Sequence, residues 1–402
     1  MPPLAPEVRL LLCAGRLALD ARARAGFGEL LRLPLDWTFL LELASAHGLV
    51  PLLYQHAEEV APEALPASVL TALWAAQEVT SRRNQAMSRE LLHVLDLLEH
   101  YGIACVPYKG PTLAQAVYGD IAMRQFSDLD ILVRCKDVSR ARQLLAKAGY
   151  APAHDLTRHA EAALLRSPSH YHTMLLHAGT GVAVELHWRT DPVRAVEKFC
   201  PDVWTRPARA DFRGTRIREF RRDELLLILA LHGSKHHWSS LGWLVDVAEL
   251  IRQGEHDWAW IWETAAKLRA RRRLALGLHL AHALLDCPLP QAARQPLASL
   301  QVEALADAIC ADLSHAGIHA TRGAVARARL DFSLCDTRLE GVRGLARSLF
   351  APSMAELTRW HLPRALQFLY VPLRIGRLAV KHLHQAAAAS PSPPPARVPW
   401  RR

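Results

Sequence analysis

The chain has 402 residues, with 49 Lys and Arg against 39 Asp and Glu, and a formal net charge of +10. Half of the residues are hydrophobic and 22% are charged. These proportions exclude wholesale disorder, a collagen-like repeat and a disulfide-stapled miniprotein. The basic excess is mostly arginine spread along the chain, so charge alone does not separate a nucleic-acid partner from a composition bias.

Membrane and redox signals are weak in this sequence. The longest apolar stretches, such as residues 225–231, fall short of the roughly 18 to 20 residues that cross a bilayer. The first residues lack the basic and apolar blocks of a secretory signal. Seven cysteines stand singly, without a CxxC pair, which predicts buried thiols rather than a zinc ribbon or disulfides. We expect a cytoplasmic protein with no transmembrane segment, and the sequence carries no sign of its oligomeric state.

The predicted elements change character near residues 101 and 217. Residues 1–100 show helical spacing of apolar residues, as in Leu91, Leu95 and Leu98, and predict a helical N-terminal segment. Residues 101–217 mix one helix near 138–148 with short β-type runs, and predict an α/β core. The expected strands are 104–108, 129–133, 171–177 and 182–188.

Helical periodicity returns in residues 218–384, which predict a C-terminal helical domain. Pro372 is expected to break the last helical run. Residues 385–402, rich in Ala, Ser and Pro, predict a disordered tail because they cannot bury enough apolar surface. The expected helices are 223–235, 243–252, 258–268, 274–285 and 366–382.

A turn with phosphate-binding character follows the first predicted strand. Gly110 permits a close backbone approach after Lys109, and Pro111 suits the first position of a helix. Free amide groups at a helix start attract anionic oxygens, and Lys109 adds a cation. An ordinary strand-to-helix turn with an exposed lysine explains the same residues.

Two carboxylates share one face of the next predicted strand. Alternate residues of a strand point the same way, so Asp128 and Asp130 lie together while Leu129 and Ile131 face the core. Adjacent like charges are either exposed to water or hold a divalent cation. Mg²⁺ is the natural guest for oxygen ligands, with Mn²⁺ as the alternative ion.

A third carboxylate lies in the predicted strand 182–188. Val184 and Leu186 form an apolar face, whereas Glu185 and His187 lie on the other face. A glutamate on a solvated sheet face is the plain reading. If this strand neighbours the one with Asp128 and Asp130, the three carboxylates converge as in two-metal phosphoryl transfer.

The segment 231–238 carries a second polar cluster. His232 and His236 are one helical turn apart, with Lys235 beside them and Asp246 on the next helix. A histidine pair at this spacing, with Asp246, can bind zinc and would suggest a metal-dependent hydrolase. Packed interfacial histidines explain the same pattern. Arg124 is the remaining candidate, either as a bidentate ligand of phosphate oxygens or as an ion-pair partner of Asp128.

These motifs together resemble the uncharacterised nucleotidyltransferase family of the polymerase-β superfold. The resemblance covers roughly residues 45–250 and includes the segment from His47 to Leu53. The last motif matches loosely, because His237 stands between His236 and Trp238. The wider superfamily has Gly-Ser at its phosphate turn, where this chain has Lys109-Gly110-Pro111, with Thr112 as the candidate hydroxyl.

The resemblance implies an α+β fold, in which helical segments flank a small mixed sheet. It implies Asp128, Asp130 and Glu185 as catalytic metal ligands. It further implies nucleotide-binding roles for residues of the phosphate turn, the arginine and the second polar cluster: Lys109, Gly110, Thr112, Arg124, His232, Lys235 and Asp246.

The reaction implied is Mg²⁺-dependent transfer of NMP from an NTP such as ATP, with release of pyrophosphate. The acceptor, whether protein, peptide, RNA or small molecule, leaves no recognisable mark. Three alternatives remain at this point: a catalytically inactive nucleotide-binding module, an RNA-binding module, and a metal hydrolase that uses the histidine cluster.

Overall fold

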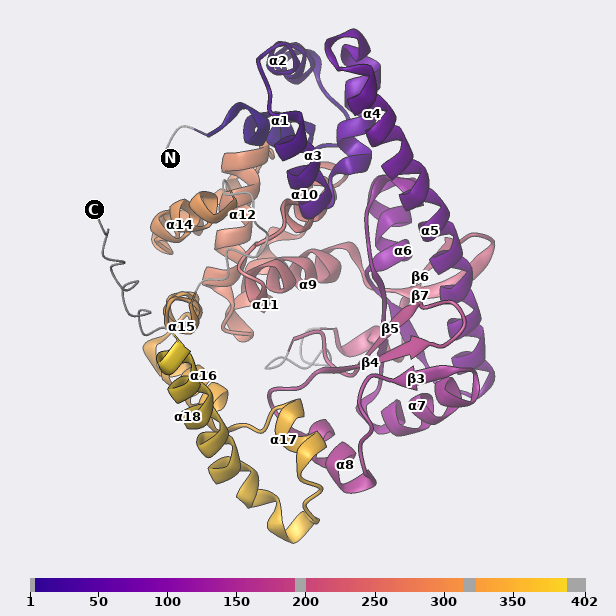
Figure 1. Ribbon diagram of the computed structural model, residues 1–402, viewed down its shortest axis with the longest axis vertical. Coiled ribbons are helices and arrows are strands. Elements are labelled where there is room, and N and C mark those ends of the chain that lie inside the picture. Colours follow the sequence, from indigo (N-terminus) through magenta and orange to yellow (C-terminus); the bar gives the residue numbers. More distant parts are fainter. Residues whose placement is uncertain (1–3, 192–199, 314–322, 389–402) are drawn as a thin grey trace, which may run out of the picture. The chain divides into compact units, whose positions relative to one another are not determined.

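The computed structural model describes residues 4–191, 200–313 and 323–388 (Figure 1). The chain divides into two compact units. The first comprises residues 1–154 and 171–344, and the second comprises residues 155–170 and 345–402. Of the tail expected at 385–402, residues 385–388 form the end of a helix, and residues 389–402 lie outside the described part of the chain.

The first unit begins with the expected helices. Asp20 and Asp36 each accept a hydrogen bond from a backbone amide three residues on, which fixes the starts of the second and third helix. The fifth helix is a single rod of 34 residues. The bounds are α1 (Pro6–Ala14), α2 (Ala21–Leu31), α3 (Trp37–His47), α4 (Val50–Val60) and α5 (Ala67–His100).

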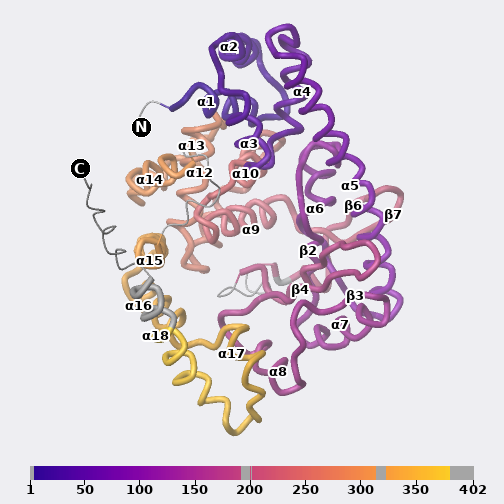
Figure 2. The backbone as a smooth tube through the Cα atoms, in the orientation of Figure 1, coloured from indigo at the N-terminus to yellow at the C-terminus, as the bar shows by residue number. Residues whose placement is uncertain are grey.

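A small mixed sheet of five strands follows, in the order β1-β2-β5-β4-β3. β2 and β5 are parallel neighbours, and the other pairs are antiparallel. α5 and α7 pack on one side of this sheet, as Figure 2 lets the reader follow. The bounds are β1 (Cys105–Pro107), α6 (Gly110–Leu113), β2 (Asp128–Val133), α7 (Val138–Lys147), β3 (Tyr150–Pro152), β4 (His172–His177) and β5 (Ala183–His187).

A hairpin and a helical bundle complete the first unit. The hairpin β6 (Ala208–Phe212) and β7 (Thr215–Glu219) lies next to β1. α9, α10 and α12 pack on one another, and an apolar core joins them to α1–α4. The helices are α9 (Arg222–Lys235), α10 (Leu241–Arg252), α11 (Trp258–Lys267), α12 (Arg271–Leu285), α13 (Gln291–Arg294), α14 (Glu303–Leu313), α15 (Ala324–Ser333) and α16 (Arg338–Phe350), whose last residues belong to the second unit.

The second unit contains α8 (Arg158–Arg166), α17 (Met354–Arg359) and α18 (Tyr370–Ala388). Glu356 is fully buried and pairs with Arg374 and Arg377, which ties α17 to α18. A 3-10 turn, Arg364–Leu369, precedes α18, so the predicted run 366–382 is broken. The expectation that Pro372 breaks the run is wrong: this residue lies in the first turn of α18, where a missing amide hydrogen is tolerated.

The sequence predicted most of these elements but missed several. The four expected strands and the C-terminal helices are confirmed within a few residues. β3 and the hairpin β6–β7 were not predicted, because their short, partly exposed runs lack a clear alternation of apolar residues. Buried thiols are confirmed at Cys105, Cys200, Cys287 and Cys310, whereas Cys135 is exposed in the turn after β2. No helix in the described residues is both long and apolar enough to cross a membrane.

Candidate functional site

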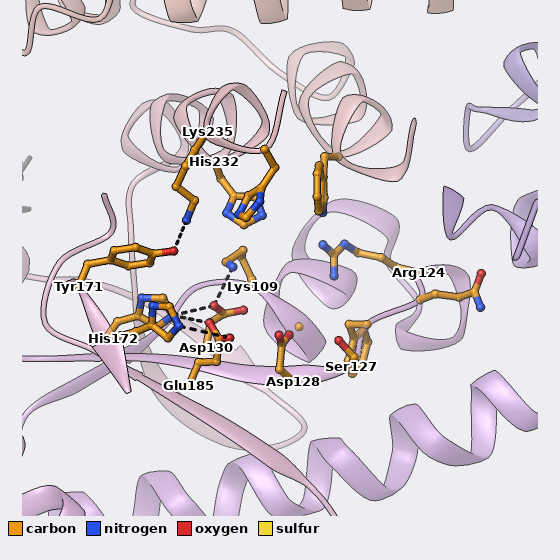
Figure 3. Close-up of a pocket in the computed structure, with 16 residues that line it drawn as sticks. Lys109, Arg124, Ser127, Asp128, Asp130, Tyr171, His172, Glu185, His232 and Lys235 are labelled. Carbon is orange, nitrogen blue, oxygen red and sulfur yellow. Dashed lines mark hydrogen bonds and ion pairs between the residues drawn. The ribbon is translucent and has the colours of Figure 1, made fainter. Parts of the chain in front are cut away.

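A cavity of about 400 Å³ lies in the first unit, between the strands β2, β4 and β5 and the helices α9 and α10. Figure 3 shows carboxylates rising from the strands and His232 and Lys235 reaching down from α9. The volume falls in the range of small-molecule sites. The cavity is lined by Lys109, Gly110, Arg124, Gln125, Phe126, Ser127, Asp128, Asp130, Tyr171, His172, Glu185, His187, His232, Lys235, His236 and Trp243.

The three expected carboxylates meet at this cavity. β2 and β5 are parallel, and their register sets Asp130 opposite Glu185. Asp128 lies two residues before Asp130 on the same strand, so both side chains point into the cavity (Figure 3). Leu129 and Ile131 are fully buried on the other face, which holds the strand in place.

The turn before α6 brings a lysine onto these carboxylates. Lys109 Nζ lies 2.7 Å from Asp130 Oδ1, and both side chains are almost completely buried. Gly110 has φ of +58°, and a Cβ there would stand 3.0 Å from the backbone oxygen of Asp128. Only glycine accommodates this approach without strain. The turn therefore packs closely against the backbone of β2, and Lys109 faces the carboxylate of Asp130.

The two aspartates differ in acidity. Burial, together with the nearby charge of Asp130, raises the pKa of Asp128 to about 6. Burial opposes ionisation of Asp130 as well, but Lys109 and His187 outweigh it and hold its pKa well below the ordinary value. Asp130 is thus always ionised near neutral pH, whereas Asp128 changes charge just below it.

Histidines from β4 and β5 surround the third carboxylate. The register of β4 with β5 places His172 opposite His187, and their rings stack at 4.9 Å. His187 Nε2 lies 3.1 Å from Glu185 Oε2 and 3.0 Å from Asp130 Oδ1. Hydrogen bonding to His187 and the charges of the two histidines outweigh burial, so the pKa of Glu185 is lowered. Burial and the neighbouring His187 lower the pKa of His172 to about 4, so it is neutral near pH 7.

α9 supplies the opposite wall. Lys235 Nζ donates to the hydroxyl of Tyr171 at 2.9 Å and lies 4.2 Å from the centre of its ring. Burial, with the charge of Lys109, lowers the pKa of Lys235 to about 8. His232 and His236 both contact the ring of Trp243, with centroids 5.2 and 5.1 Å away. The wall is therefore cationic at one end and aromatic at the other.

Two predicted site residues lie elsewhere. Asp246 is buried and accepts hydrogen bonds from the hydroxyl of Tyr118 and from Nε and Nη2 of Arg124, at 2.8 to 2.9 Å. It does not line the cavity, and both of its oxygens are used. Thr112 also lies off the cavity, and its hydroxyl donates to the carbonyl of Lys109. Asp246 therefore does not join His232 and His236 in a zinc site.

Arg124 has a different partner from the one expected. The sequence left open an ion pair with Asp128, but the guanidinium makes a two-pronged contact with Asp246. The reason is tertiary: α10 brings Asp246 to the loop before β2, and an aspartate accepts the arginine fork well. Arg124 still lines the cavity, with Nη1 outside this fork.

Sequence reasoning did not single out seven residues of the cavity, namely Gln125, Phe126, Ser127, Tyr171, His172, His187 and Trp243. His187 carried a usable signal, since strand alternation places it beside Glu185. Tyr171 and His172 carried none, because they reach the site only through the antiparallel pairing of β4 with β5. Trp243 depends on the packing of α10 against α9. Trp238, in contrast, is a packing residue, fully buried against Gly233 and Gly277.

Comparison with known proteins gives one family match. The model of a family described as uncharacterised nucleotidyltransferase matches residues 34–286, more than half of the chain. The match covers every residue of the cavity, the closed pair of Arg124 and Asp246, and the sheet. No curated protein matches the chain. The small mixed sheet with flanking helices is the fold that the motifs predicted, and the chain belongs to the uncharacterised nucleotidyltransferase family.

Proposed function

We propose that this protein transfers a nucleoside monophosphate from an NTP to an acceptor and releases pyrophosphate, with Asp128, Asp130 and Glu185 as the reaction centre. The observation that carries the proposal is the convergence of these three carboxylates from two parallel strands on one cavity. Membership of a nucleotidyltransferase family supports the same class of reaction.

The residues present suit a divalent metal ion. Three carboxylates face the cavity, and Lys109 forms an ion pair with one of them, Asp130, which leaves Asp128 and Glu185 as further oxygen ligands. Carboxylate oxygens are the ligands that Mg²⁺ prefers, and Mn²⁺ accepts them as well. Asp128, Asp130 and Glu185 would hold the ion. Bound there, it would neutralise the triphosphate and acidify the attacking hydroxyl.

The lysines would bind the nucleotide's phosphates. Lys109 and Lys235 approach the cavity from opposite sides, the first from the turn before α6 and the second from α9 (Figure 3). Their ammonium groups can stabilise the negative charge that grows on the leaving pyrophosphate. Arg124 is held by Asp246 in a fixed position at the cavity wall, where its remaining nitrogen can face an anion.

The carboxylates are suited to different tasks. Glu185 has a lowered pKa, so it stays ionised and acts as a ligand more readily than as a proton store. Asp128 has a pKa of about 6 without a metal ion, and a bound cation would keep its carboxylate ionised. We therefore assign Asp128 and Asp130 to the metal ion, with Glu185 as a further ligand or as the base for the attacking hydroxyl.

The test is a transfer assay with each α-³²P-labelled NTP and Mg²⁺ or Mn²⁺, with and without a cell extract as the source of acceptors. The double variant Asp128→Asn/Asp130→Asn should form no labelled product. The matched control, Glu63→Gln/Glu263→Gln, removes two exposed carboxylates and should behave as wild type. Labelled product that persists in the Asp128→Asn/Asp130→Asn variant would overturn the proposal. The proposal would also fail if the wild type transferred no label and bound NTP and metal with the same affinity as this variant.

A further inference from the structure

Two histidines and a glutamate gather on the β4–β5 side of the cavity. One ligand atom each from His172, Glu185 and His187 lies within 4.8 Å of the other two. His187 is buried, and the other two side chains are 28% and 17% exposed toward the cavity. A small inward movement of these side chains would bring the three atoms onto one ion.

The ring nitrogens of His187 have distinct surroundings. Nδ1 lies 3.3 Å from the carbonyl oxygen of Arg189, which can only accept a hydrogen bond. When Nδ1 donates to this carbonyl, Nε2 is the nitrogen that is available to a metal ion. A backbone carbonyl that fixes the tautomer in this way is the usual support of a metal-binding histidine.

Nε2 of His187 points at two carboxylate oxygens. Asp130 Oδ1 is 3.0 Å away and Glu185 Oε2 is 3.1 Å away. A proton on Nε2 is shared with these oxygens when no metal ion is bound, and a metal ion can take the place of that proton. His172 approaches from the next strand, with Nε2 3.7 Å from Glu185 Oε1. Its Nδ1 is buried without a hydrogen-bond partner.

We infer that His172, Glu185 and His187 form a two-histidine, one-carboxylate site for a first-row transition-metal ion, beside the all-oxygen position at Asp128 and Asp130. Imidazole ligands favour such ions over Mg²⁺. The inference deepens the proposed function, because Glu185 belongs to both ligand sets. The role of this metal site in the reaction rests on the proposed function, whereas metal binding itself does not depend on that function.

The consequence is a cavity with two unlike metal positions. The position at Asp128 and Asp130 has oxygen ligands and suits the Mg²⁺ that accompanies a triphosphate. The position at Glu185 has two nitrogen ligands and keeps its ion when Mg²⁺ is in excess. The protein should therefore retain a tightly bound transition metal in the absence of nucleotide.

The experiment uses the full chain with substoichiometric Mn²⁺ and excess Mg²⁺, and records pulsed electron paramagnetic resonance. Imidazole coordination gives nitrogen modulation of the Mn²⁺ signal. His172→Phe keeps the ring stacking but removes both nitrogens, and should weaken the modulation and lower Mn²⁺ affinity roughly tenfold or more. His177→Phe changes a histidine at the other end of β4 and should leave both unchanged. Thermal melting checks that each variant folds. If His172→Phe does not fold, His172→Gln replaces it, and the same losses of modulation and affinity are expected.

Two results would overturn the inference. One is bound Mn²⁺ without nitrogen modulation in the wild type, and the other is a folded His172→Phe protein with wild-type affinity and modulation. If either result accompanies transfer activity that depends on Asp128 and Asp130, the proposed function survives alone. If nitrogen modulation is present but no NTP is turned over, the metal site survives and the proposed function fails.

Discussion

Two buried carboxylate clusters stand close together in the first unit, and they are built differently. Around Asp246 one carboxylate meets one guanidinium and one phenol, and the structure gives each of its oxygens a hydrogen bond. Around Asp130 three carboxylates meet a single lysine and two histidines. The first cluster balances its charge with fixed groups, whereas the second sets three carboxylates against one contacting lysine, and we propose that a metal ion completes its balance.

The difference indicates a structural role for the cluster around Asp246 and a ligand-binding role for the cluster around Asp130. A saturated ion pair has a fixed geometry and no vacancy for a ligand, so Arg124 and Asp246 act as a strut between the loop before β2 and α10. An unbalanced cluster is costly to bury, and proteins keep such clusters where a ligand restores the balance.

Loss of Asp130 should remove activity and leave the fold intact. Asp130→Asn should lower the rate of nucleotidyl transfer by at least about 100- to 1000-fold, because the carboxylate at the centre of the cluster is lost. The measurement is the labelled-NTP assay at saturating Mg²⁺, with circular dichroism as the check on folding. An unfolded variant would mean that Asp130 has a structural role like that of Asp246, and it would contradict the proposed difference between the two clusters.

Loss of Asp246 should act mainly on stability. Asp246→Ala leaves the buried Arg124 without its partner, and should lower the free energy of unfolding by about 3–5 kcal/mol. Denaturant unfolding measures this change. The control is Glu263→Ala, which breaks an exposed pair with Lys267 and should cost less than about 1 kcal/mol. A change at Asp246 as small as the control's would show that the pair is not a strut.

Acidification should weaken metal binding at the unbalanced cluster. The pKa of Asp128 is about 6, so below that pH its carboxyl is protonated and cannot serve as a metal ligand. Mg²⁺ affinity measured by calorimetry should fall about tenfold between pH 7 and pH 5. Asp128→Asn should bind Mg²⁺ more weakly at pH 7 and lose most of this pH dependence. A wild-type affinity that is constant over this range would contradict the prediction.

The smallest effect concerns stability without metal. A raised carboxyl pKa means that the folded state prefers the protonated form, so ionised Asp128 destabilises the metal-free fold above about pH 6. Asp128→Asn should therefore raise the melting temperature by about 1–3 °C at pH 8. The gain should vanish near pH 4, where both carboxyl and amide are neutral. Excess Mg²⁺ should reverse the order, because it stabilises the wild type more than the variant.

The sequence predicted one of these clusters better than the other. Strand alternation predicts that Asp128 and Asp130 share a face, and the apolar runs predict both strands. That the strands are neighbours is a long-range fact, so the meeting with Glu185 stayed conditional until the sheet was known. The pair of Arg124 and Asp246 was out of reach, because no periodicity relates a loop arginine to an aspartate on a distant helix.

The long helix α5 and the hairpin β6–β7 also depend on contacts between residues that are distant in the sequence. The spacing of apolar residues predicts that residues 67–100 are helical, but their continuity as one rod comes from packing against α4, α7 and the sheet. β6 and β7 pair with each other and lie beside β1, where the tertiary context makes strands of an ambiguous run. Local pattern predicts element type, and packing decides length and partners.

The parallel pairing of β2 with β5 also determines when the carboxylate cluster can form during folding. Asp130 and Glu185 are far apart along the chain, and helices α7 and α8 and the strands β3 and β4 lie between them. Closing so long a loop is slow compared with forming local helices. A one-residue slip in this pairing would turn Glu185 to the other face of the sheet. The three-carboxylate cluster therefore cannot form in a chain that has only its helices, because it needs the correct pairing of β2 with β5.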